Sequence, residues 1–166
     1  MKLKILWIGK TKSSSIKALA ADYLERIRRI APCEILEIRD PAKGRVPRVE
    51  ERIRMEGEDI SRQIPKAVYT VALDESGKQH SSEEFARWLE TEQNSGTKEI
   101  MFVVGGPDGL SREVAARARM VLSLGKMTWT HEMCRALLLE QIYRALCILN
   151  KIPYHKGSLP APDRRR

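Results

Sequence analysis

The amino-acid sequence predicts an α/β fold with a mostly parallel sheet flanked by helices. Short β-prone runs alternate with amphipathic runs of helical period along the whole chain. Serine, proline and glycine residues at helix start and stop positions separate the two kinds of run. The length of 166 residues suits one domain with a core large enough for stability on its own.

Three strands and two helices are predicted in the first half of the chain. The strands are apolar or alternating runs at residues 2–9, 33–40 and 67–74. The helix at 13–30 begins at serines that can cap it and ends before Pro32. The helix at 49–64 is charged and amphipathic and ends before Pro65, and a basic loop with Pro and Gly precedes it at 41–48.

The second half continues the alternation after a predicted turn at residues 75–80. Ser81 and Glu84 form a capping box for a helix at 81–96, which Gly96 ends. A strand is expected at 98–104. The remaining predicted elements are a helix at 112–125 capped by Ser111, a short strand at 126–130 and a long helix at 131–151.

This order implies βαβ units, in which ligands bind beyond the carboxyl ends of the strands. The stretch VVGGPDGLS, residues 103–111, places three glycines at such an end. No Gly-Lys-Ser/Thr follows them, and the G-x-G-x-x-G spacing is absent, so neither phosphate-binding motif is present. The interpretation that remains is that the glycines let the backbone pack closely against another loop or against an uncharged part of a cofactor.

Composition points to a protein that binds a polyanion. The net charge is +8, of which the last ten residues carry +2, so the body carries +6. Nucleic acid is the first candidate partner, although an aromatic content of 5% argues against a base-stacking surface. No run is long enough for a membrane helix, and no signal peptide is recognisable, so a cytoplasmic location is expected.

The last predicted helix carries the polar residues most open to a functional interpretation. HEMCR, residues 131–135, begins like a zinc motif, but Arg135 replaces the second histidine and metal binding is rejected. His131 either caps the helix or serves a site. Glu140 and Arg144 form either a structural ion pair or part of a buried charge cluster. Apolar residues on more than one face predict contact with another subunit.

Together these motifs resemble one known family. VALD, VVGGPDGLS, SLGKMTWTHEMCRALLLEQIYRA and a terminal PYH are similar to the RlmH family, which methylates pseudouridine in the large ribosomal RNA. The spacing H-x3-R-x4-E-x2-YRA from His131 to Ala145 is far more specific than the glycine loop alone. The resemblance runs from the first strand to about Lys156.

The resemblance implies a SPOUT, or α/β-knot, fold with a C-terminal trefoil knot. It implies a homodimer that binds S-adenosylmethionine between three loops near the dimer interface. It also implies methylation of N3 of pseudouridine 1915 in 23S rRNA, within the assembled ribosome. The cofactor-binding residues it implies are Leu73, Gly105, Gly106, Leu124, Gly125, Lys126, Met127, Thr128 and Trp129.

Five residues are predicted to act in the reaction. The target nitrogen must lose a proton, and His131, Glu140 and His155 are the candidate bases. Arg135 can hold a phosphate of the RNA or stabilise negative charge on the carbonyl oxygens of the target nucleobase. Tyr154 and His155 lie on a terminal segment that can fold over the cofactor, although a frayed end is the alternative.

Two other functions stay open at this stage: a SPOUT enzyme with another RNA target, such as a tRNA, and a non-catalytic ribosome-binding factor. One domain is expected over residues 1–156. Residues 157–166 extend beyond the usual end of the family, and their Pro, Gly and Arg content predicts a disordered basic tail. The tail either adds phosphate contacts or plays no part.

Overall fold

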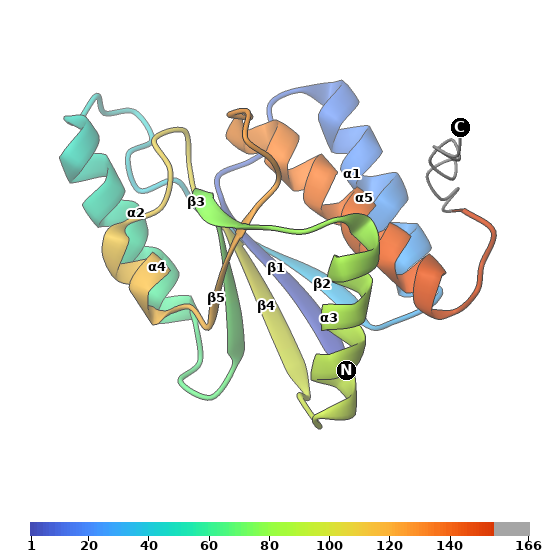
Figure 1. The fold of residues 1–166 in the computed structure, drawn as a ribbon. Helices are drawn as coiled ribbons and strands as arrows, with labels where there is room; N and C mark the ends of the chain where they lie inside the picture. The colour runs from blue at the N-terminus through green and yellow to red at the C-terminus, as the bar shows by residue number, and fades with distance from the viewer. Residues whose placement is uncertain (155–166) are drawn as a thin grey trace, which may run out of the picture.

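The structure, a computed structural model, describes residues 1–154 and contains five strands that alternate with five helices (Figure 1). The order of elements agrees with the order predicted from the sequence. The elements are β1 (Lys2–Ile8), α1 (Ser14–Arg28), β2 (Cys33–Ile38), α2 (Val49–Gln63), β3 (Tyr69–Gln79), α3 (Ser82–Asn94), β4 (Glu99–Val104), α4 (Arg112–Arg117), β5 (Met120–Ser123) and α5 (His131–Leu149).

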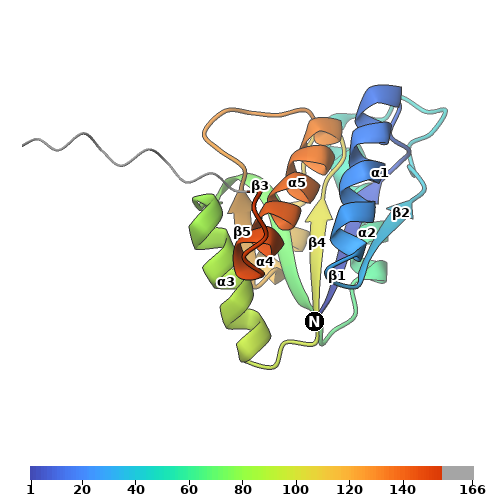
Figure 2. The ribbon, with the colours of Figure 1, turned by 90° about the vertical axis from the view of Figure 1, so that its right-hand side faces the viewer.

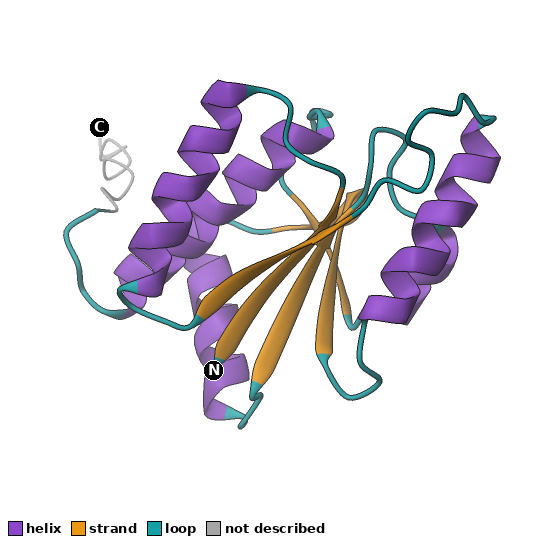
Figure 3. Cartoon of the chain, turned by 180° about the vertical axis from the view of Figure 1, so that it is seen from behind, coloured by secondary structure: helices purple, strands orange, loops and turns teal. Residues whose placement is uncertain are grey.

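The strands form one sheet in the order β2-β1-β4-β3-β5, and every pairing is parallel. The predicted α/β class with a parallel sheet is therefore confirmed. Because all five strands run the same way, their carboxyl ends meet at one edge, where their loops gather (Figure 3).

Helices cover both faces of the sheet, with α1, α3 and α5 on one face and α2 and α4 on the other (Figures 1 and 2). Successive side chains of β1 point to opposite faces of the sheet, so this strand contributes to the core on both faces. Leu3, Ile5 and Trp7 join the cluster beneath α1, α3 and α5, whereas Leu6 and Ile8 pack with Ile60 and Val114 of α2 and α4. Among residues 1–154, no helix is long and apolar enough to span a membrane.

The serine caps predicted for α1, α3 and α4 are confirmed, and Ser13 caps α1 by accepting from the Ile16 backbone N–H. Ser81 accepts a hydrogen bond from the Glu84 backbone, and the Glu84 carboxylate accepts one from the Ser81 backbone in return. Ser111 caps α4 by accepting from the Val114 backbone N–H. These bonds satisfy N–H groups that the first helical turn leaves without partners.

The prediction for residues 112–130 is wrong in detail. Helix α4 ends at Arg117, residues 120–123 form strand β5, and the predicted strand at 126–130 is an exposed loop. The register pairs Met120 and Val121 with Val71 and Ala72 of β3. Backbone pairing with β3 therefore overrides the helical pattern of the segment, while residues 126–130 have no strand beside them.

Strand β3 also runs past its predicted end at residue 74. It continues to Gln79, and the register on β5 shifts between Leu73 and Lys78, both of which face Leu122. A Cβ atom added to Gly77 would lie 2.7 Å from the backbone of Val121 and Leu122. Gly77 thus lets the extension of β3 lie directly on the β5 backbone, where a predicted turn gives way to a bulged strand.

His155 and the predicted tail at 157–166 lie outside the described residues. The domain boundary after residue 156 and the trefoil knot both stay predictions.

Replacing Gly77 with alanine should destabilise the fold, because the new methyl group would overlap backbone atoms that have no rotamer to change. We expect a loss of about 1–3 kcal/mol in the free energy of unfolding, measured by denaturant titration. Lys78→Ala, at the exposed neighbouring position, is the control and should stay close to the parent protein. Equal stability of Gly77→Ala and the parent would contradict the close packing.

Candidate functional site

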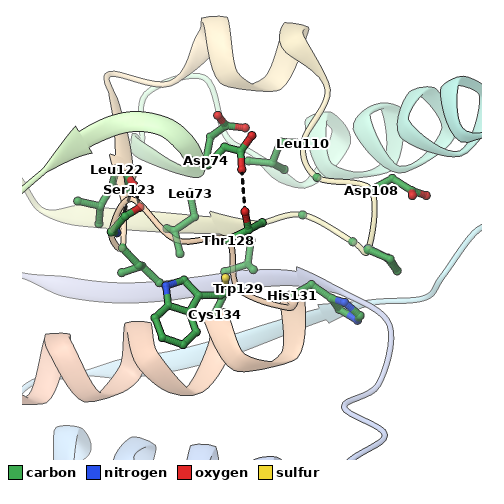
Figure 4. A pocket seen from close by; sticks show the side chains of 18 of the residues that line it. Leu73, Asp74, Asp108, Leu110, Leu122, Ser123, Thr128, Trp129, His131 and Cys134 are labelled. Atoms are coloured by element: carbon green, nitrogen blue, oxygen red, sulfur yellow. Dashed lines mark hydrogen bonds between the residues drawn. The ribbon is translucent and has the colours of Figure 1, made fainter.

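A cavity of about 340 Å³ opens at the carboxyl ends of β4 and β5, beside the middle of β3 (Figure 4). Three chain segments form its walls: Leu73–Glu75 in β3, Val104–Leu110 after β4, and most of residues 122–129 after β5. His131 and Cys134 from the start of α5 complete the lining. The volume lies in the range of small-molecule sites, about 300–1,000 Å³.

The glycine loop after β4 folds tightly on itself. A Cβ atom added to Gly105 would lie 2.6 Å from the Gly109 carbonyl carbon, and Gly106 and Gly109 form an isolated β-bridge. Gly109 has a φ of +86°, a conformation that favours glycine. The predicted close approach of backbone is present, but the space that these glycines leave is filled by the protein itself.

The segment after β5 is held in place by short-range hydrogen bonds. The Ser123 hydroxyl donates to the Gly125 carbonyl at 2.8 Å and accepts from the Gly125 N–H at 3.3 Å. Thr128 donates to Glu75 at 3.4 Å, the dashed line in Figure 4, and so links this segment to β3. Trp129 lines the cavity while 42% exposed. The indole ring is thus available to a ligand.

The lining of the cavity is acidic. Asp74, Glu75 and Asp108 contribute carboxylates, of which Asp108 is ion-paired with Arg52 on α2 at 3.5 Å. Among the described lining residues there is neither lysine nor arginine. Such a site favours a ligand with a positive charge and offers nothing to neutralise a phosphate. The remaining lining consists mainly of apolar side chains and backbone, which suits the uncharged part of a small molecule.

His131 begins α5 at the wall of the cavity, where Figure 4 shows its ring beside the glycine loop. Burial lowers the pKa of this histidine below its ordinary value of 6.5, and the nearby Arg135 lowers it further. The neutral form therefore prevails at neutral pH and can accept a proton. Thr130 supplies the cap of α5 by accepting from the Met133 backbone, so His131 itself is not the cap.

Arg135 lies beneath the site and does not line the cavity. It is fully buried, with its guanidinium donating to the Thr11 hydroxyl at 2.8 Å and to the Ile8 carbonyl, and lying 4.9 Å from the centre of the Trp7 ring. Glu132 accepts from the backbone of Lys12 at 2.7 Å and of Ser13 at 3.1 Å. These two residues therefore fasten the loop after β1 to α5.

Glu140 of α5 and Tyr154, which follows that helix, form a separate cluster. Glu140 accepts hydrogen bonds from Arg144 at 3.0 Å and from Tyr154 at 3.1 Å, and Tyr154 also bonds the Tyr23 hydroxyl at 3.1 Å. Glu140 is nine positions after His131 on the same helix, a distance of about 14 Å along its axis. The structure thus brings His131 to the cavity and leaves Glu140 and Tyr154 away from it within one chain.

The residues predicted to bind a cofactor gather at the cavity with one exception. Lys126 is exposed and does not contribute to the lining. Those that line the cavity are Leu73, Gly105, Gly106, Leu124, Gly125, Met127, Thr128 and Trp129.

Glu56 is a residue of this region that the sequence analysis missed. It is 2% exposed on α2, and a Cβ atom added to Gly106 would lie 2.4 Å from its Oε2 atom. Burial and the nearby Asp40 raise the pKa of Glu56 to about 7. A sequence signal exists, because Glu56 falls between Ile53 and Ile60 on the apolar stripe of its helix.

Comparison with known proteins gives one consistent result. The family described as "Predicted SPOUT methyltransferase" matches residues 1–155. The chain is 46% identical over 155 residues to ribosomal RNA large subunit methyltransferase H of Trichlorobacter lovleyi, covering 93% of this chain and 99% of that protein. It is 39% identical over 160 residues to the protein of the same name from Rhizobium meliloti, covering 95% and 100%.

Solved structures agree on the fold. A probable methylase family protein from Haemophilus influenzae Rd KW20 superposes with a TM-score of 0.52 at 15% identity, covering 97% of this chain and 72% of that one. A putative methylase family protein from Neisseria gonorrhoeae gives a TM-score of 0.52 at 12% identity, covering 96% and 88%.

The buried Glu56 carboxyl predicts a pH-dependent stability difference. Folding raises its pKa from 4.5 to about 7, so between these pH values the unfolded state loses the proton while the folded state keeps it rather than bury a charge. The parent protein therefore loses stability as the pH rises, until the pH passes about 7. Glu56→Gln carries no such charge. We expect the variant to gain about 1–3 kcal/mol on the parent between pH 5 and pH 8, measured by denaturant titration.

Glu58→Gln is the matched control, because Glu58 is exposed on the same helix and ion-paired with Arg54. Its stability difference from the parent should not rise over this range. A constant difference for Glu56→Gln across the same pH values would show that Glu56 is ionised throughout or not buried.

Proposed function

We propose that this chain methylates 23S ribosomal RNA. The proposal follows from its family, because the chain belongs to the SPOUT methyltransferase family and within it to the RlmH family. The specific reaction is transfer of a methyl group from S-adenosylmethionine to N3 of pseudouridine 1915 on the assembled ribosome. Matches over at least 99% of relatives named ribosomal RNA large subunit methyltransferase H support this assignment.

The observation that carries the cofactor assignment is the acidic cavity without lysine or arginine in its described lining. S-adenosylmethionine supplies an electrophilic methyl group on a positively charged sulfur, and it contains no phosphate. Carboxylates of Asp74 and Glu75 suit the positive charge, and Trp129 offers an aromatic face. The backbone of Gly105 and Gly106 and residues 124–129 would hold the uncharged parts of the molecule.

His131 is the residue that we assign as the base. Its neutral ring lies at the cavity wall and can take the proton that N3 of the nucleotide must lose. Arg135 acts through the loop after β1, which it joins to α5, because its side chain is fully buried and donates to Thr11 and Ile8 of that region. The role of Arg135 is thus to position a loop beside the site.

A homodimer would bring the second cluster to the cavity. Glu140 and Tyr154 lie too far from His131 to act on the same nucleotide within one chain. The half-buried Met133, Cys134 and Leu137 give α5 an apolar surface near the cavity that a second copy would cover. We therefore place Glu140, Tyr154 and His155 of one subunit at the site of the other.

The path of the chain supports a trefoil knot. Helix α5 packs between α1 and α3, whereas β5 lies at the outer edge of the sheet beyond β3 (Figure 2). Residues 124–130 must therefore pass the carboxyl end of β4 and the neighbouring part of β3. There they lie beside the extension of β3, which packs closely on β5 at Gly77. Threading of α5 behind that extension is the arrangement that we propose.

The loops around the cavity carry positive charge that can hold RNA phosphates. Lys10, Lys12, Arg39, Lys43 and Arg48 are exposed in the loops after β1 and β2, at the same edge of the sheet as the cavity. Within residues 1–154 none of these side chains forms an ion pair with an acidic residue. An acidic cavity inside a basic rim separates the site for the cofactor from the surface for the nucleic acid.

Purified protein should transfer a labelled methyl group from S-adenosylmethionine to 70S ribosomes from a strain that lacks this enzyme. Mass spectrometry of the 23S rRNA should place the methyl group on N3 of pseudouridine 1915. Label on a tRNA instead would indicate another RNA target. Cofactor binding without transfer to any RNA, or no cofactor binding at all, would favour a non-catalytic factor.

Replacing both Lys10 and Lys12 with alanine should weaken ribosome binding while leaving the affinity for S-adenosylmethionine close to the parent value. Each lost phosphate contact should lower the slope of log affinity against log salt by about one. Lys66 and Lys98, exposed at the opposite end of the sheet, provide the matched double variant. Equal salt slopes for the two double variants would remove the loop after β1 from the RNA surface.

A further inference from the structure

The glycine loop has two sides, and a buried acid lies against the side that faces away from the cavity. Glu56 on α2 is 2% exposed, and a Cβ atom on Gly106 would lie 2.4 and 2.6 Å from its two carboxylate oxygens. Gly106 itself lines the cavity. One residue of backbone therefore separates the carboxyl group of Glu56 from the proposed cofactor.

The environment of Glu56 leaves its charge only partly compensated. Its Oε2 atom has no hydrogen-bond partner in the described chain, and the same holds for Nε of Arg52. Arg52 on the same helix is the cation that faces it, while Asp40 from the loop after β2 and Asp108 from the glycine loop are the acids. Arg52 interacts with Asp108 as well as with Glu56, because its Nε lies 3.5 Å from the Asp108 carboxylate.

The loop is built to transmit a change at Glu56. Gly105 packs on Gly109 and Leu110, so the loop is one compact turn. On α2, a Cβ atom added to Gly57 would lie 2.5 Å from the Ser111 hydroxyl, so the helix and the end of the loop are also in close contact. The carboxyl group is packed tightly between these surfaces. Gain or loss of its proton therefore affects the position of Gly106.

We propose that Glu56 is a positioning residue that couples loss of its proton to cofactor binding, with the ionised carboxylate favoured in the loaded site. The proposal rests on the proposed function, because it takes the ligand to be the positively charged S-adenosylmethionine. A cation in the cavity stabilises a carboxylate one backbone layer away. The ionised oxygens can also accept from the backbone N–H of Gly106 and hold the loop against α2.

The direction of the pH effect follows from linkage. If the cation lowers the pKa of Glu56 from about 7, ionisation in turn strengthens binding of the cation. Below pH 7 binding must expel a proton from Glu56, and above pH 7 it need not. Affinity should therefore rise with pH, by about three- to tenfold between pH 6 and pH 8 for a pKa that falls by about one on binding.

The test is calorimetric titration of the full chain with S-adenosylmethionine between pH 5.5 and pH 8.5, in buffers of different ionisation enthalpy. The parent protein should release protons on binding below pH 7 and gain affinity with pH. Glu56→Gln should lose this part of both effects and bind as the parent does at low pH. Glu58→Gln, the exposed neighbour on α2, should behave like the parent.

His131 also titrates at the cavity, but its contribution is present in both the parent and Glu56→Gln and cancels in their ratio. That ratio of affinities should increase several-fold from pH 6 to pH 8. A ratio that does not change with pH overturns the coupling, even if the variant binds more weakly, because a purely structural role would give a constant loss.

A second measurement does not depend on a variant that folds. The carbon-13 signal of the Glu56 carboxyl, followed by NMR in the parent protein, should titrate at a lower pH once S-adenosylmethionine is added. An unchanged midpoint with saturating cofactor overturns the coupling and leaves the methyltransferase assignment intact. Failure of the parent to bind S-adenosylmethionine at every pH overturns the proposed function, and the coupling with it.

Discussion

The return of the chain from β5 to α5 is the constraint on which the site depends. Strand β5 is an edge strand of the sheet, yet α5 packs between α1 and α3 on the other side of β3. Residues 124–130 therefore cross the carboxyl ends of the strands and form one wall of the cavity. The crossing also brings the start of α5 to that wall, so that His131 faces the cavity and Arg135 reaches the loop after β1.

Sequence patterns predict most of this fold because local signals and tertiary packing agree over most elements. They disagree at residues 112–130, where apolar residues of helical spacing become β5 through pairing with β3. They disagree again at residues 75–80, where a turn-like composition hides a bulged strand that needs Gly77. In both places a partner distant in the sequence decides the conformation, and local spacing contains no information about that partner.

The candidate site, like the fold, is predicted where local sequence signals suffice and is missed where distant residues meet. The glycine loop was predicted to matter because it follows a buried strand, and the resemblance to a family supplied the other two walls. Neither source indicated that Gly106 contacts Glu56, since α2 and the loop are 50 residues apart in the chain. A glutamate inside the apolar stripe of α2 was the visible signal, and it becomes informative only when the loop that covers it is known.

The strand order has a consequence for synthesis of the protein. The central strand β4 joins the β1–β2 pair to β3, yet it is made after all three. Until residues 99–104 leave the ribosome, the nascent chain holds only the β1–β2 pair and a β3 strand without either of its neighbours, because β5 is also made after β4. Folding of the whole domain is thus delayed until late in translation, and the half-made chain is the species most exposed to aggregation and most in need of a chaperone.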